Sequence, residues 1–176
     1  MKRIAALLML AAMPGVAIAQ APVCMPENQA AALVTFALPT LVEQLANRCR
    51  DDLPPTSYLQ ANAAALADRY RPDAAAAWPE ARRAIAGIFT QFLGQPMPKD
   101  MNSDLIRTLA EPALGGLLAK QVNRSDCHVA DAAVANVAPL TGRQIGRLAA
   151  IAATIADRKG KGIAGVLKVC KAGDDQ

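Results

Sequence analysis

The amino-acid sequence predicts an all-α protein: a compact bundle of about six helices, several of them kinked by proline, stapled by disulfides and containing no sheet. Three observations favour this fold class. Alanine, the best helix former, dominates the long segments. Apolar residues recur at the three-and-four spacing of a helix face. No stretch alternates apolar and polar residues over enough length to indicate a strand.

The first predicted helix spans about 27–50. Its apolar stripe comprises Leu38, Leu41, Val42, Leu45 and Cys49. Pro26 suits the first turn of this helix, and Pro39 predicts a kink or a restart within it. Pro54 and Pro55 end the segment.

Two further helices are predicted before a linker at 94–100. Thr56 or Ser57 caps the second helix, and Pro72 is expected to end it. Asp73 is expected to cap the third helix, which Pro79 interrupts early. The expected inner face of the third helix consists of Ile85, Ile88, Phe89 and Phe92. The linker Gly94–Asp100 is rich in glycine and proline.

Three helices are predicted after the linker. The fourth opens at Ser103 and carries a proline, Pro112, in its middle. Ser125 is expected to cap the fifth, which ends near 137. Thr141 is expected to cap the sixth, which runs to about 158 and is apolar enough to be a buried central helix. Residues 166–170 form a short apolar tail that Cys170 is expected to pin back.

The N-terminus predicts export. Residues 1–19 have the positive leader, the apolar run and the A-x-A cleavage site of a signal peptide. Residues 20–176 are then a single all-α domain, with helical halves at 20–93 and 101–176 as a further possibility. The apolar run of this leader is too short to span a bilayer. We expect the protein to be periplasmic or secreted from a bacterium. No transmembrane segment is expected after cleavage, because Arg143, Arg147 and Asp157 bracket an apolar run in the sixth helix that is also too short.

An even number of cysteines in an exported chain indicates disulfides. Four cysteines allow three pairings, and we favour the sequence-adjacent one, Cys24–Cys49 with Cys127–Cys170. This pairing has a geometric difficulty, because the ends of one straight helix between Cys24 and Cys49 would lie more than about 30 Å apart. Either Pro39 bends that helix or Cys24 pairs elsewhere.

The sequence contains few candidates for catalytic residues. Gly160–Gly165 matches G-x-G-x-x-G literally, but a helix precedes it where a dinucleotide site needs a strand, so we interpret it as a linker. His128 is the only histidine and shares a helix face with Asp131. A metal site needs a further ligand, and a Cys127–His128 nucleophilic pair fails if Cys127 is oxidised. We therefore predict no metal, no cofactor and no catalytic residue.

The last third of the chain is basic. Between 141 and 171 there is one acid, Asp157, among seven basic residues. The basic residues are Arg143, Arg147, Arg158, Lys159, Lys161, Lys168 and Lys171. They form either a patch for an anionic partner or an ordinary solvated face with cations near a helix C-terminus. Without its leader the chain carries a formal charge of only +2, since Lys2 and Arg3 are removed from +4, and this predicts no nucleic-acid binding.

Three function hypotheses follow. The first is an exported, non-enzymatic helical binding or interaction module, possibly inhibitor- or immunity-like, whose partner is a protein or an envelope component. The second is a hydrolase of the cell envelope. The third is a membrane- or stress-associated periplasmic helper that uses the basic segment. The sequence leaves the oligomeric state open.

Overall fold

The computed structural model describes residues 24–98, 101–158 and 169–170. Within them five α-helices follow one another, with a short 3₁₀ turn before the fourth, and there is no strand, so the all-α class is confirmed. The helices are α1 (Glu27–Arg48), α2 (Tyr58–Leu93), α3 (Ser103–Lys120), α4 (Cys127–Val137) and α5 (Gly142–Arg158). The predicted signal peptide lies outside the described residues.

The expected break at Pro72 is wrong, because α2 runs unbroken through both Pro72 and Pro79. The two prolines are exposed and seven residues apart, so they share one outer face of the helix. Water can hydrate the carbonyl groups that these prolines leave without donors, while the opposite face stays packed. That buried face includes Leu59, Leu66 and Tyr70. The second and third predicted helices are therefore one helix.

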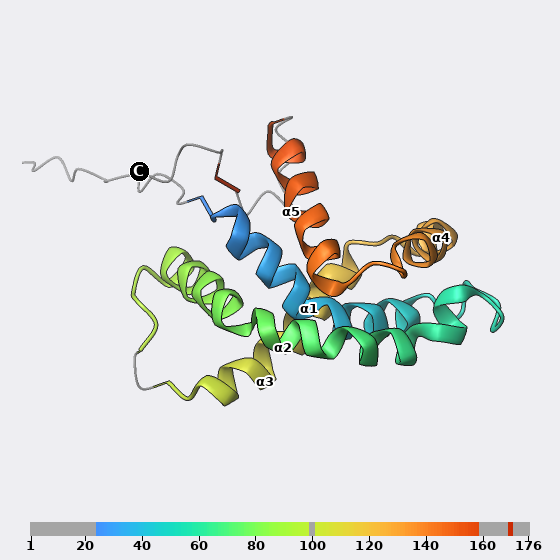
Figure 1. Cartoon of the computed structure of the whole chain (residues 1–176), viewed down its shortest axis with the longest axis horizontal. Helices are drawn as coiled ribbons and strands as arrows, with labels where there is room; N and C mark the ends of the chain where they lie inside the picture. Colours follow the sequence, from blue (N-terminus) through green and yellow to red (C-terminus); the bar gives the residue numbers. More distant parts are fainter. Residues whose placement is uncertain (1–23, 99–100, 159–168, 171–176) are drawn as a thin grey trace, which may run out of the picture.

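Helix α1 is the centre of the fold. It packs against α2, α3 and α5, and two core clusters lie along it. The first cluster joins the C-terminal half of α1 to α2 and α4, around Leu45 and Leu59. The second joins the N-terminal half of α1 to α2 and α5, around Phe36, whose ring lies 5.0 Å from that of Trp78. Figure 1 shows α2 running along α1, and α5 projecting away from this pair.

Two glycines let neighbouring helices approach α1 closely. Gly146 of α5 lies against α1 so tightly that a Cβ atom there would overlap the Thr35 hydroxyl and come within 2.5 Å of the Ala31 carbonyl oxygen. Gly115 of α3 faces Thr40, where a Cβ atom would lie 2.8 Å from the Thr40 Cβ. Helix packing on both sides of α1 therefore depends on the absence of a side chain at these positions.

The predicted sixth helix, α5, is not a buried central helix. It packs on α1 through small residues, and its large apolar side chains Leu148, Ile151 and Ile155 are about half exposed. The expected inner position of Phe92 is also wrong, because its side chain is 61% exposed at the end of α2. The buried residues of that half of α2 are Ala81 and Ala84. In an alanine-rich chain the side that packs most closely is the side with the smallest residues, since small side chains let helix backbones approach.

Several predicted boundaries are confirmed. Ser57 caps α2 by accepting a hydrogen bond from the Gln60 N–H. Thr141 and Gln144 form a reciprocal capping box at the start of α5. Gly94 ends α2 with a φ of 67°, a conformation that glycine adopts without strain. Helix α3 begins at Ser103 as predicted, and the Asn102 side chain caps it.

The favoured disulfide pairing is wrong. The structure joins Cys24 to Cys170 and Cys49 to Cys127. Because α1 is one continuous helix, its two ends stay far apart, and neither end cysteine can reach the other. The Cys24–Cys170 bond pins the chain at 169–170 beside the start of α1, where Val169 pairs with Met25 as one isolated β-bridge. The Cys49–Cys127 bond ties the start of α4 to the end of α1.

Gly146→Ala and Gly115→Ala are expected to lower the free energy of unfolding by about 1–3 kcal/mol each, because the added methyl group overpacks the contact with α1. Gly116→Ala is the matched control. No atom lies within 4 Å of a Cβ at that position, so we expect it to raise stability by about 0.4–1 kcal/mol. Urea unfolding followed by fluorescence of the single tryptophan, Trp78, measures all three. Equal effects at 115, 116 and 146 would contradict the close-packing interpretation.

A non-reducing peptide map is expected to return two linked pairs, Cys24 with Cys170 and Cys49 with Cys127. Replacing Cys49 and Cys127 together by alanine should cost about 4–5 kcal/mol of unfolding free energy, because the bond closes a loop of 78 residues in the unfolded chain. Recovery of Cys24 linked to Cys49 would refute the observed topology.

Candidate functional site

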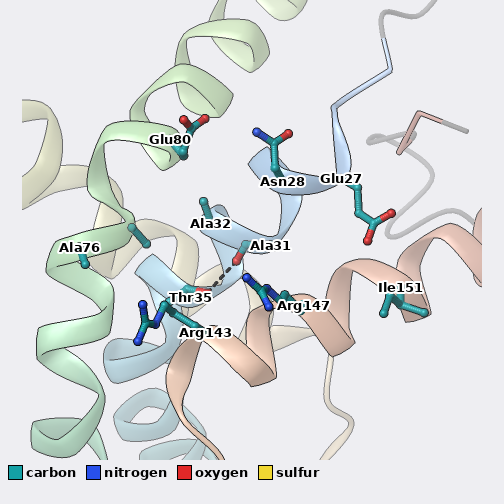
Figure 2. Close-up of a pocket in the computed structure, with 11 residues that line it drawn as sticks. Glu27, Asn28, Ala31, Ala32, Thr35, Ala76, Glu80, Arg143, Arg147 and Ile151 are labelled. Atoms are coloured by element: carbon teal, nitrogen blue, oxygen red, sulfur yellow. Dashed lines mark hydrogen bonds between the residues drawn. The ribbon is translucent and has the colours of Figure 1, made fainter. Parts of the chain in front are cut away.

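An open groove of about 630 Å³ lies between α1, α2 and α5. Alanines make much of its surface, with Ala31 and Ala32 on α1 and Ala76 and Ala77 on α2. Two arginines and Ile151 line the α5 side (Figure 2). The groove exists because these side chains are too small to fill the space between diverging helices.

Beside the groove, α5 is anchored to α2 through Asp73. Both oxygens of Asp73 take part: Oδ2 accepts from the Gly142 N–H at 2.8 Å, and Oδ1 lies 3.3 Å from the Arg143 Nε. Asp73 was expected to cap a helix of its own. It does cap a helix N-terminus, but that of α5, 69 residues further along the chain.

The floor of the groove is held by a buried hydroxyl. Thr35 is 3% exposed. Its Oγ1 donates to the Ala31 carbonyl at 2.8 Å, and the Gly142 carbonyl oxygen lies 3.3 Å away as a second acceptor. The Thr35 hydroxyl is therefore used within the fold and adds no free polar group to the floor of the groove.

Charges of both signs border the groove. Arg143 is paired with Asp73 but keeps 71% of its side chain exposed. Arg147 is exposed and makes no ion pair with another residue that the structure describes. On α2, Glu80 Oε1 lies 2.6 Å from Arg83, and Glu80 Oε2 is buried with no hydrogen-bond partner among the described residues. Figure 2 shows both guanidinium groups extending from α5, with Glu80 at the opposite end of the groove.

The structure brings part of the predicted basic patch to this site. Arg143 and Arg147 line the groove together. Arg158 is the last residue of α5, and its side chain is not described. Lys159, Lys161 and Lys168 lie outside the described residues, as does Lys171. No sequence signal distinguishes the alanines of the groove floor, because alanine is common throughout this chain.

The residues that the sequence analysis considered and set aside for catalysis or metal binding do not line the groove. His128 is exposed on α4. Asp131 accepts a hydrogen bond from the Leu59 N–H at 2.6 Å, so it helps to cap α2 from α4. Cys127 is fully buried and bonded to Cys49, which removes the thiol that a Cys–His pair requires. Among the residues described, no three His, Cys, Asp or Glu side chains gather to form a metal site.

A cluster of charges at the junction of α1 and α4 is structural and was not foreseen from the sequence. Arg124, just before α4, lies 2.8 Å from Asp52 and 3.0 Å from Asp51. The hydrogen bonds that Arg124 donates to these carboxylates, above all the one to Asp52, raise the pKa of its guanidinium. Close by, the Arg48 Nε donates to the Val122 carbonyl at 2.7 Å. These contacts reinforce the Cys49–Cys127 bond at the junction of α1 and α4.

Helix α1 is long and apolar enough to cross a membrane by length and composition alone, with a mean hydropathy of 1.2 over its best window. Half of that window is buried by the other helices. The position of α1 at the centre of the fold accounts for its apolar character.

No family model matches this chain, and no curated protein or solved structure is significantly similar to it. Function is therefore inferred from the groove and its surroundings alone.

Asp131→Ala is expected to lower the free energy of unfolding by about 1–2 kcal/mol, because the Leu59 N–H loses its acceptor. His128→Ala, on the exposed face of the same helix, should change it by less than about 0.5 kcal/mol. Chemical unfolding of the two variants separates these roles. Equal losses would indicate that His128 and Asp131 act as a pair.

Proposed function

We propose that the protein is an exported, non-enzymatic helical binding module that binds its partner in the α1–α2–α5 groove. One observation carries this proposal: the groove is open, floored by alanine and bordered by Arg143 and Arg147. A rigid, mostly apolar concave surface with a few polar groups at its edges is the general form of a binding site. The partner is a protein or a component of the cell envelope.

Export is supported by the cysteines. All four are oxidised to disulfides in the structure, and such bonds persist in oxidising compartments. The predicted signal peptide at 1–19 agrees with this assignment. We therefore propose a periplasmic or secreted location in a bacterium.

A role without catalysis is supported by the positions of the residues that were considered for catalysis. Cys127 and Asp131 have structural partners, and His128 is exposed on α4, away from the residues that line the groove. The alternative, an envelope hydrolase, was based on these residues, and their positions do not support it. An inhibitor- or immunity-like protein is the form of binding module that fits a rigid, disulfide-bonded helical surface. This comparison rests on fold class alone.

Site-specific photocrosslinking tests the proposal. With a photoreactive side chain in place of Ile151, which lines the groove and is 47% exposed, we expect covalent adducts with an envelope component. The same side chain in place of Val129, which is 70% exposed on α4, is the control and should give none. Absence of adducts at 151, or equal adducts at both positions, would contradict the proposal.

A second experiment blocks the groove and tests whether the partner binds there. Ala76 lines the groove, whereas its neighbour Ala75 is exposed and does not. Ala76→Phe should abolish the adduct at 151, because the ring occupies the groove. Ala75→Phe should leave the adduct unchanged. If neither variant changes crosslinking, the groove is not where the partner binds.

A further inference from the structure

Helix α5 has three of its four large apolar side chains on the outside, while the fourth, Ile145, packs against the core cluster around Leu45. Leu148, Ile151 and Ile155 are 53%, 47% and 50% exposed. At about 100° per residue these positions fall within an arc of about 60° on one side of the helix. We call these three residues the α5 outer stripe.

The opposite side of α5 is made of small residues. Gly146 contacts Thr35, and Ala150 and Ala153 are almost completely buried in the core cluster around Phe36. The usual arrangement for a surface helix is the reverse, with large apolar residues inward and polar residues outward. The outer stripe is therefore a contiguous apolar surface that the described part of the fold does not cover.

Both charged side chains that the structure describes on α5 are cations. Arg143 and Arg147 lie on its flank toward the groove. The acids on the elements packed nearby are Asp73, Glu80 and Glu27. Asp73 pairs with Arg143, Glu80 pairs with Arg83, and Glu27 lines the groove. From 141 to 171 the sequence has seven basic residues and one acid. An occupant of this face must be apolar where it meets the stripe and anionic beside it.

We propose that the α5 outer stripe and its flanking arginines dock the protein on an anionic membrane surface. This inference rests on the proposed function, since it names the envelope component that this face binds. A single helix that presents an apolar stripe beside arginines is the form that lies in a bilayer interface, with side chains among the acyl chains and cations at the headgroups. Anionic headgroups supply the charge complementary to Arg147, which has no ion pair among the described residues.

A second copy of the chain fits this face less well. Two stripes packed together would bring Arg143 and Arg147 of both copies to the same interface. The described α5 side chains include no acid, and of the acids nearby Asp73 and Glu80 are already paired, which leaves only the Glu27 of each copy to offset four arginines. Like charges at such an interface destabilise it.

Vesicle co-sedimentation of the disulfide-intact protein tests the proposal. The probes are vesicles of phosphatidylcholine alone and of phosphatidylcholine mixed with phosphatidylglycerol. We expect binding only to the anionic vesicles, and loss of binding near 1 M salt, where the screening length falls to about 3 Å. Equal binding to both vesicles, no binding to either, or a stable dimer without lipid would overturn it.

Variants locate the contact. Arg147→Gln should weaken binding about fivefold, the effect of removing roughly 1 kcal/mol per cation near an anionic surface. Replacing Leu148, Ile151 and Ile155 together by serine should weaken it by more than tenfold, since each loses apolar burial. The matched control replaces Leu105 and Leu109 by serine. They are 55% and 62% exposed on α3, and binding should not change. Equal loss in the control would overturn the assignment to α5.

A variant that gains a fluorescence signal on membrane binding makes the test of membrane docking independent of folding defects. Ile151→Trp should shift its fluorescence to shorter wavelength on addition of anionic vesicles, because the indole enters the interface. Leu109→Trp should not shift. A shift at 109 and none at 151 would overturn the proposal.

The two proposals fail in different ways. Photocrosslinks from 151 to a protein, with no vesicle binding, would refute membrane docking and leave the binding module intact. No crosslink and no vesicle binding would refute both.

Discussion

The fold depends on the close approach of α5 and α3 to the central helix α1, which two glycines allow. Gly146 lies against Thr35 and Gly115 lies against Thr40. Both contacts are so close that a Cβ atom at either glycine would overlap the threonine. Once a helix packs through its smallest residues, its larger residues must lie elsewhere on its surface. This consequence places Leu148, Ile151 and Ile155 on the outside of α5, and it gives the protein an apolar outer surface without unfolding any part of the core.

Contacts between residues far apart in the sequence fix the ends of the helices. Asp73 of α2 caps α5, and Asp131 of α4 helps to cap α2. The two disulfides act at the two ends of α1, where Cys24 binds the 169–170 segment and Cys49 binds the start of α4. Each of these links satisfies a helix terminus or restrains a chain end. Together they keep a core that is poor in aromatic side chains in a single arrangement.

The same use of small residues explains the groove. Helices α2 and α5 both pack on α1 and meet at Asp73, and the alanines beyond this contact do not fill the space between them. Arginines on α5 border this space because they occupy the part of the helix between the buried glycine face and the outer stripe. The groove and the stripe are thus adjacent parts of one surface, with Ile151 belonging to both.

The sequence by itself determined the helical class, most helix ends and the oxidised state of the cysteines, because propensity, caps and compartment are local or compositional properties. It also placed Arg143 and Arg147 in a predicted basic patch, and both line the groove. Only the tertiary structure decided that Pro72 and Pro79 lie inside one helix, because this depends on which face of α2 meets water. The disulfide pairing could be assigned only from the positions of both ends of α1 in the folded protein. The groove and the inverted burial of α5 could not be predicted either, because periodicity identifies an apolar face but not whether glycines on the opposite face pack more closely.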